Sequence, residues 1–218
     1  MTHARLRDLR VARACLPSRP FRLLSRKFLR HIAAALLLTT ALSACPQPKA
    51  SEYDVKAAYL FNFGKFIRTA SPTPVQAPPT DRRTFDICIL GNDPVGAALE
   101  SLTANEQIDR RPVRIRRFKE VIQESPLQSA QIRSCDIAYI GDDAQIESDL
   151  GVLRNADVLT VSDSPSFLNH GGMIQFVTVA NHVRFAVNLD AVHRTHLVLS
   201  SELLRVASRV VDAHEVLP

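Results

Sequence analysis

Short apolar runs that alternate with helix-like segments constrain the fold of this chain more than any other feature. Residues 85–90, 135–140 and 157–161 are such runs, and each is typical of a buried strand. The segment after the first run begins with Asp93, a favoured helix N-cap, and Pro94, which suits the first helical position. Strands separated by helices favour a largely parallel sheet that helices cover on both faces.

The C-terminal third departs from this alternation. Residues 172–178 and 182–187 predict two strands, and the three residues between them are few enough for an antiparallel hairpin. A helix is expected from Asn188, with a break near 195–199. Ser200 or Ser201 then caps a last helix, whose apolar stripe is Leu203, Leu204, Ala207, Val210 and Val211. The predicted fold class is therefore α/β: a mixed, largely parallel sheet flanked by helices on both faces, with a C-terminal antiparallel hairpin and helices.

The other segments carry simpler predictions. A helix rich in aromatic residues begins at Glu52, and four prolines within residues 69–79 favour an extended loop. Residues 112–118 alternate apolar and basic side chains, which favours an edge strand or one with a solvated face. The remaining expected elements are a helix over 95–102, a weak helix over 119–131 interrupted at Pro126, and a helix from Asp142 or Asp143 to about Arg154.

The N-terminus has the pattern of an export signal. Residues 1–30 hold nine Lys and Arg against one acid, and an uncharged apolar run follows over residues 31–44. A basic head, a short apolar stretch and small residues before a cleavage point are the marks of such a signal. The apolar run is shorter than the roughly 20 residues that a membrane-spanning helix needs.

Leu42–Cys45 resembles the lipobox of bacterial lipoproteins, in which the Cys is acylated and becomes the first mature residue. The alternative is an ordinary cleavage site followed by a chance Cys. We therefore expect an export signal over 1–44, a polar tether over 45–51 and one α/β domain over 52–218. The expected location is the periplasm, with a membrane anchor through Cys45.

Removing the signal changes the charge of the chain. The whole sequence carries +5, but the mature part keeps 18 basic against 21 acidic residues, a net charge of −3. The basic character therefore belongs to the targeting signal, and bulk charge gives no reason to expect a nucleic-acid partner.

Two cysteines, Cys88 and Cys135, remain after the signal and the lipidation site are set aside. An even pair in an oxidising compartment predicts a disulfide. The loop that it closes is worth about 4 kcal/mol in the chain-entropy model. Two buried free thiols in strands are the alternative.

Motifs for catalysis are missing from the sequence. Residues 91–96 lack the glycine spacing of a dinucleotide loop and the Lys-Ser/Thr of a P-loop. His193 and His196 have a spacing that can suit a metal, but no third ligand follows from the pattern, so solvated helix residues are favoured. We expect no enzyme activity, no cofactor and no metal. The basic run Arg110, Arg111, Arg114, Arg116 and Arg117 could face anionic lipid or an acidic partner, although a solvated sheet edge is favoured.

Four blocks of sequence, taken in order and spacing, resemble the YfiR family of periplasmic repressors. They are Val55–Phe66, Ile87–Pro94, Val158–Asp163 with Gly171–Ile174, and Val183–Leu189 with Leu199–Leu204. The resemblance spans about residues 52–211. It implies a non-catalytic protein that binds and represses an inner-membrane diguanylate cyclase, and so controls cyclic-di-GMP signalling and biofilm formation. It also implies relief by an outer-membrane lipoprotein or by redox stress.

Site residues follow from the hairpin pattern and from this resemblance. Phe167, Met173, Ile174 and Phe176 could form a partner-binding surface, with core packing as the alternative for each. Arg68, Ser200 and Ser201 are candidates for a ligand-binding groove, mainly by resemblance. A homodimer is left open, and the rival function is a small-solute binding lipoprotein of a transport system.

The chain departs from the family pattern in two places. Relatives often carry Trp-Pro after the first helix, where this chain has Arg68 and Thr69, and a Gly where this chain has His196. The resemblance therefore supports the fold more strongly than the identity of the partner.

Overall fold

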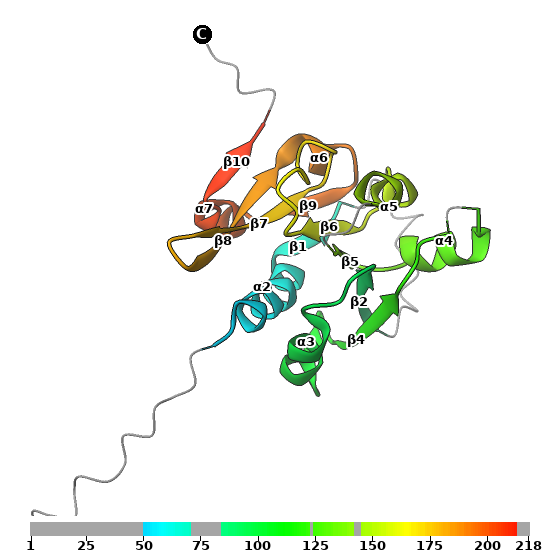
Figure 1. Cartoon of the computed structure of the whole chain (residues 1–218), viewed down its shortest axis with the longest axis horizontal. Coiled ribbons are helices and arrows are strands. Elements are labelled where there is room, and N and C mark those ends of the chain that lie inside the picture. The colour runs from blue at the N-terminus through cyan, green and yellow to red at the C-terminus, as the bar shows by residue number, and fades with distance from the viewer. Residues whose placement is uncertain (1–49, 71–83, 123, 142–144, 213–218) are drawn as a thin grey trace, which may run out of the picture. The chain divides into compact units, whose positions relative to one another are not determined.

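An eight-stranded sheet lies at the centre of the computed structural model, with the strand order β10-β8-β7-β6-β5-β2-β4-β3 (Figure 1). The structure describes residues 50–70, 84–122, 124–141 and 145–212. The helices are α2 (Glu52–Phe66), α3 (Gly96–Thr103), α4 (Pro126–Arg133), α5 (Ile146–Leu153), α6 (Leu189–His193) and α7 (Ser201–Val206). The strands are β1 (Ile67–Thr69), β2 (Phe85–Leu90), β3 (Gln107–Ile108), β4 (Arg111–Phe118), β5 (Ile137–Ile140), β6 (Leu159–Ser162), β7 (Ile174–Val179), β8 (His182–Asn188), β9 (Leu197–Leu199) and β10 (Arg209–Val211).

Parallel pairing dominates the sheet. Strand β2 pairs in parallel with both β4 and β5, and the parallel run continues through β6 to β7. Strands β7 and β8 form the antiparallel hairpin, and β10 adds in parallel to β8 at the edge. A separate antiparallel pair joins β1 to β9. The predicted α/β class, with a largely parallel sheet and a C-terminal hairpin, is confirmed.

The hairpin turn contains two residues, Ala180 and Asn181, because Val179 and His182 are themselves paired. Both turn residues have left-handed backbone conformations, with φ values of 48° and 61°. A two-residue turn of this kind matches the natural twist of the flanking strands. Its register places Phe176 opposite Phe185.

Side chains of the sheet divide between two hydrophobic clusters, one on each face. In β5, Ile137 and Tyr139 enter the first cluster, while Ala138 and Ile140 enter the second. Helices α2, α3, α6 and α7 contribute to the first cluster, and α4 and α5 to the second. The alternation follows from the two-residue period of a strand. Helices therefore cover both faces, as predicted.

Helix α2 begins where the sequence predicts, because Ser51 caps it. The Ser51 hydroxyl accepts from the backbone N–H of Asp54, and the Asp54 carboxylate accepts from the Ser51 N–H, which forms a capping box. Further along the helix, Tyr59 and Phe63 pack against Phe176 and Phe185 of the hairpin, with ring centroids 5.0–6.0 Å apart.

Three local predictions need correction. The last helix ends at Val206, and Val210 and Val211 lie in β10, where β-branched residues gain strand pairing with β8. The described residues between β4 and Pro126 (119–122, 124 and 125) are not helical, because Pro126 starts α4 with Ser125 as its N-cap instead of interrupting an existing helix. Strand β4 is not at the edge, because the two-residue β3 pairs beyond it, but its alternating exposure is that of the other predicted form, a strand with one solvated face.

Some expectations fall on residues outside the described part of the chain. These are the export signal over 1–44, the lipidation site Cys45, most of the loop over 69–79, and the caps Asp142 and Asp143. Within the described ranges, each helix is too short or too polar to cross a bilayer. The division into signal, tether and regulatory domain stays a prediction.

Candidate functional site

A buried disulfide joins strand β2 to the segment that leads into the neighbouring strand β5. Cys88 lies in β2 and Cys135 lies two residues before β5, with their Cα atoms 6.1 Å apart. Both residues have no accessible surface. The expected pairing of these cysteines is confirmed, and it bridges 47 residues that include α3, β4 and α4.

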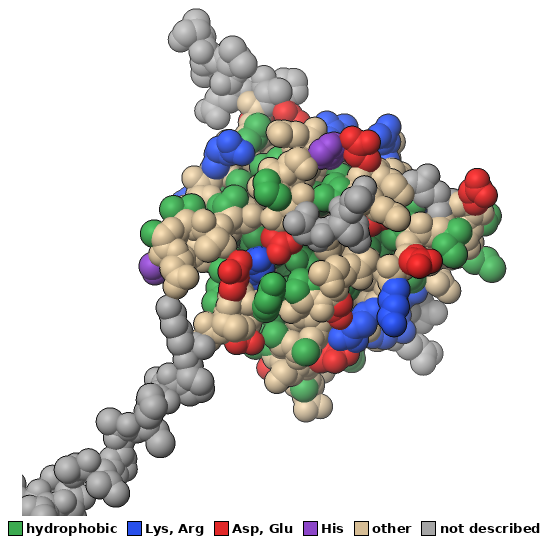
Figure 2. All heavy atoms as spheres, viewed as in Figure 1, with side chains coloured by type: hydrophobic (Ala, Val, Ile, Leu, Met, Phe, Trp, Pro, Cys, Tyr) green, Lys and Arg blue, Asp and Glu red, His purple; other side chains and the backbone are tan. Residues whose placement is uncertain are grey.

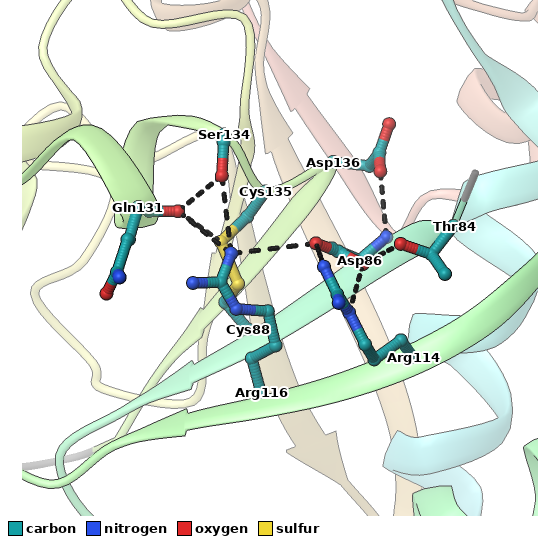
Figure 3. The surroundings of a disulfide bond; sticks show 9 residues. All are labelled: Thr84, Asp86, Cys88, Arg114, Arg116, Gln131, Ser134, Cys135 and Asp136. Carbon is teal, nitrogen blue, oxygen red and sulfur yellow. Dashed lines mark hydrogen bonds and ion pairs between the residues drawn. A yellow bond between two sulfur atoms is a disulfide. The ribbon is translucent and has the colours of Figure 1, made fainter. Parts of the chain in front are cut away.

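An arginine from β4 covers the segment that carries the disulfide (Figure 3). Arg116 Nη1 donates to the Gln131 carbonyl oxygen at 3.1 Å and to the Ser134 hydroxyl at 3.3 Å. The same nitrogen lies 3.5 Å from an Asp86 carboxylate oxygen. Arg116 therefore connects β4, β2 and the end of α4 around the cysteine pair.

Asp86 is the centre of this network, and only 5 % of it is exposed. Its carboxylate accepts two hydrogen bonds from Arg114, at 2.9 and 2.6 Å, and one from the Thr84 hydroxyl at 2.7 Å. Burial alone would raise the pKa of Asp86, but the Arg114 and Thr84 hydrogen bonds and the nearby positive charges outweigh it. The pKa of this carboxyl therefore lies below its ordinary value, so Asp86 stays negatively charged and can pair with Arg114 and Arg116.

Two further arginines of the basic run, Arg111 and Arg117, are also paired with carboxylates within the domain. Arg111 pairs with Asp136 at 3.0 Å, and its guanidinium carbon lies 4.8 Å from the centroid of the Phe85 ring. Arg117 pairs with Asp93 and Glu100, each at 2.6 Å, and these contacts raise its pKa above the ordinary value. Figure 2 shows basic side chains beside acidic ones over the surface around β4. Four of the five arginines of the run, Arg111, Arg114, Arg116 and Arg117, are therefore paired with carboxylates of the domain and do not form the unpaired basic face that the sequence left open.

A second charged cluster surrounds Lys56 of α2, a lysine that is only 4 % exposed. Its ammonium lies 2.8 Å from both Asp163, just after β6, and Glu52, one turn earlier in the helix. Burial alone would lower the pKa of Lys56, but the hydrogen bonds to the two carboxylates outweigh it and raise that pKa. This cluster was not predicted from the sequence. The sequence feature that could have indicated it is the position of Lys56 on the helix face that carries the core residues Leu60 and Phe63, because a buried lysine needs a carboxylate partner.

The proposed partner-binding residues lie inside the molecule. Phe167 and Ile174 have no accessible surface, and Met173 and Phe176 are 5 % and 2 % exposed. Phe167 also lies close to Gly172, where a Cβ atom would overlap its ring. The expectation that these four residues present a surface to a partner is therefore corrected: they pack in the core. Apolar character alone could not separate the two alternatives.

The structure brings the three proposed ligand-binding residues to the β1–β9 pair but not into one hollow. Arg68 lies in β1, and its Nη1 donates to the carbonyl oxygens of Ile67 and Lys65. Ser200 caps α7 by accepting from the Leu203 N–H at 3.2 Å, and Ser201 is the exposed first residue of that helix. Their role toward a ligand stays a prediction.

Metal ligands were not expected, and His196 instead lies 3.2 Å from both carboxylate oxygens of Asp157. Within the described ranges, no three or more His, Cys, Asp or Glu side chains lie where they could hold a metal ion.

Comparison with known proteins gives a family. No curated protein matches this sequence. A crystal structure of a conserved domain protein from Vibrio cholerae O1 biovar eltor strain N16961 aligns with a TM-score of 0.49 and 10 % identity, over 75 % of this chain. This chain spans 61 % of that protein's length. The model of the YfiR/HmsC-like family matches residues 53–208, which include the disulfide, the Asp86 network, the Lys56–Asp163 pair and all but the last strand of the sheet. The chain belongs to the YfiR/HmsC-like family.

Proposed function

We propose that this protein is an exported, non-catalytic regulator that binds and represses an inner-membrane diguanylate cyclase, and thereby limits cyclic-di-GMP and biofilm formation. The observation that carries the proposal is the family match over residues 53–208. At family level, that match supports a periplasmic regulator of cyclic-di-GMP signalling.

The internal bonding of polar groups supports a role without chemistry of its own. The charges of Asp86 and Lys56 are matched by partners within the domain. Two further buried polar side chains also serve the fold: the Thr160 hydroxyl accepts from the Met173 N–H, and the Asn188 amide donates to the Leu168 carbonyl oxygen. Groups committed in this way stabilise a rigid domain and are poorly placed to act as acids, bases or nucleophiles.

Export of the domain is supported by its disulfide, because such bonds persist in the periplasm and are rare in the cytosol. In the proposal, the lipidated Cys45 holds the protein at a membrane, and an outer-membrane lipoprotein is a second partner that relieves repression. Reduction of the Cys88–Cys135 bond weakens repression because it loosens the connection between β2 and β5. A regulator shifts its receptor only through different affinities for the active and inactive states.

The proposal is tested by adding the purified protein to membranes that carry one host diguanylate cyclase at a time. Binding measured by crosslinking, together with a fall in cyclic-di-GMP synthesis for at least one cyclase, supports it. Unchanged synthesis with every cyclase contradicts it. The same experiment with the Cys88→Ser variant tests whether the disulfide regulates repression. The variant is first checked for a retained fold, and full repression by it excludes a regulatory disulfide.

The second candidate is a small-solute binding lipoprotein of a transport system. A hollow of about 740 Å³, described below, is the observation in its favour, because small-molecule sites fall in the range of about 300–1,000 Å³. Deletion in the native host separates the two functions. A nutrient-uptake defect with normal cyclic-di-GMP supports transport, whereas raised cyclic-di-GMP with normal uptake supports regulation.

A further inference from the structure

A hollow of about 740 Å³ lies between α5, the loop after β6 and α6. It is separate from the disulfide network and from the Lys56 cluster, since it shares no residue with either. Polar side chains form much of its wall, and apolar residues contribute Leu150, Leu153, Met173 and Ala191. The polar lining residues are Glu147, Arg154, Asn155, Thr160, Asn169, His170, Arg194 and Thr195.

The inner part of the hollow is formed by the sheet. Thr160 of β6, Met173 before β7 and Ala191 of α6 are all at least 95 % buried. The Thr160 hydroxyl oxygen accepts from the Met173 N–H at 3.1 Å, and among the described residues its own hydrogen has no acceptor, so it can be donated to a ligand. A rigid floor with one hydroxyl donor suits a ligand that combines a polar group with a short carbon skeleton.

Two arginines line the hollow, and they differ from those of β4 in lacking a partner. In the part of the chain that the structure describes, Arg154 and Arg194 have neither an ion pair nor a side-chain hydrogen bond, while Arg111, Arg114, Arg116 and Arg117 each have a carboxylate. The Arg194 guanidinium lies beside Gly171, another lining residue. A Cβ atom built on Gly171 would lie 3.4 Å from Arg194 Nη2, which is an ordinary contact distance. Gly171 has φ of +91°, a conformation that favours glycine.

Among the described residues that line the hollow, the one carboxylate is already engaged. Glu147 lies 3.1 Å from His170 Nε2, and His170 Nδ1 lies 3.0 Å from the carbonyl oxygen of Ser166. Two cationic side chains therefore border the hollow with a single carboxylate, which has its own partner. Such an excess of positive charge favours an anion inside.

We propose that this hollow binds a small organic anion through Arg154 and Arg194, with the charged group of the ligand a carboxylate or phosphate. A guanidinium offers paired N–H donors that match both groups. The Thr160 hydroxyl and the Asn155 and Asn169 side chains supply further hydrogen bonds, and Leu150, Leu153 and Met173 contact the carbon part. A soluble metabolite and a lipid headgroup share this chemistry. The inference does not depend on repression of a cyclase.

The test is calorimetric titration of the purified protein with citrate and with inorganic phosphate. Binding to lipid headgroups is tested by sedimentation with vesicles of phosphatidylglycerol. Vesicles of phosphatidylcholine, which has no net charge, are the reference. We expect saturable binding of at least one anion, weakened about tenfold or more in both Arg154→Gln and Arg194→Gln, a loss of about 1.4 kcal/mol or more. Arg205→Gln is the matched control, an exposed arginine of α7 outside the hollow, and should bind like the parent.

The outcomes separate the sources of the anion. Binding of citrate or phosphate that depends on both arginines supports a soluble ligand, and arginine-dependent binding to phosphatidylglycerol vesicles alone supports a headgroup. Arg194→Lys keeps the charge but not the paired donors, so it should bind between the parent and Arg194→Gln. The proposal is overturned if no probe binds, or if Arg205→Gln loses as much affinity as the two hollow variants. Thermal unfolding of each variant shows that the fold is retained.

Discussion

Lys56 of α2 and Asp163 behind β6 form an ion pair of 2.8 Å, although 107 residues separate them in the sequence. The pair fixes the N-terminal half of the first helix to the carboxyl end of a central parallel strand. The second oxygen of Asp163, Oδ1, is buried without a hydrogen-bond partner in the described structure. Lys56 is therefore the main compensation for the charge of Asp163.

Replacing Lys56 should destabilise the fold. Lys56→Met keeps the length of the side chain but leaves Asp163 with an uncompensated charge, so we expect the free energy of unfolding to fall by about 2–3 kcal/mol. Urea denaturation measures it. Lys65→Met, an exposed lysine of the same helix, is the control and should cost less than about 0.5 kcal/mol. Adding Asp163→Asn to Lys56→Met should recover part of the lost free energy of unfolding. If the losses of the two single variants simply add in the double variant, the pairing is contradicted.

Removing the disulfide should lower stability substantially. Closing a 47-residue span is worth about 4 kcal/mol in the chain-entropy model, and a domain of this size loses about 2–4 °C in Tm for each kcal/mol. We therefore expect Cys88→Ser with Cys135→Ser to unfold about 10 °C below the parent in a thermal scan. Treatment of the parent with dithiothreitol should reproduce the shift, and the double variant should not respond to it. An equal Tm for oxidised and reduced parent would show that the bond contributes nothing.

The Asp86 network should make stability depend on acidity. Because the pKa of Asp86 is lower in the folded protein than in the unfolded chain, its contribution is complete above the unfolded value of about 3.9 and is lost as the pH falls through the folded value. Asp86→Asn should cost about 2 kcal/mol at pH 7 and progressively less as the pH falls below 4. Urea denaturation at a series of pH values measures this convergence. A cost that stays constant down to pH 2 would show that the charge of Asp86 is not the source.

Two glycines should respond in opposite directions to the same substitution. A Cβ on Gly64 of α2 would lie 2.6 Å from the Ile108 side chain and 2.8 Å from the Phe85 ring, so Gly64→Ala should cost about 1–3 kcal/mol through overpacking. A Cβ on Gly151 of α5 meets nothing within 4 Å, so Gly151→Ala should add up to about 1 kcal/mol through helix propensity. Equal effects in chemical denaturation would contradict the packing of α2 against β2 and β3.

Local pattern was enough to predict most of the fold. The three apolar runs became β2, β5 and β6, and the two segments around Ala180 became the hairpin, because burial on both faces and short turns leave clear marks in a sequence. The prediction was wrong where a short segment can adopt either structure. Arg209–Val211 continues a helical stripe by spacing, yet it pairs with β8, since tertiary hydrogen bonding outweighs a weak local preference.

The candidate sites were harder to predict than the fold. The cysteine pair followed from counting, whereas the partners of Arg114, Arg116 and Lys56 depend on which strands become neighbours. Phe167 and Met173 could be assigned to surface or core only once the loop before β7 was placed. Arg154 and Arg194 are 40 positions apart, and only the fold brings them to one hollow.

Intracellular cyclic-di-GMP is the quantity that a repressor of a diguanylate cyclase must change. It should be compared in the native host, in a strain lacking this protein, and in strains that additionally lack one membrane diguanylate cyclase each. We expect the nucleotide to rise in the single deletion, to return to the parental level when one particular cyclase is also removed, and to fall again on complementation with the exported protein. A single deletion with parental cyclic-di-GMP, or a rise that persists whichever membrane cyclase is removed, would contradict the account.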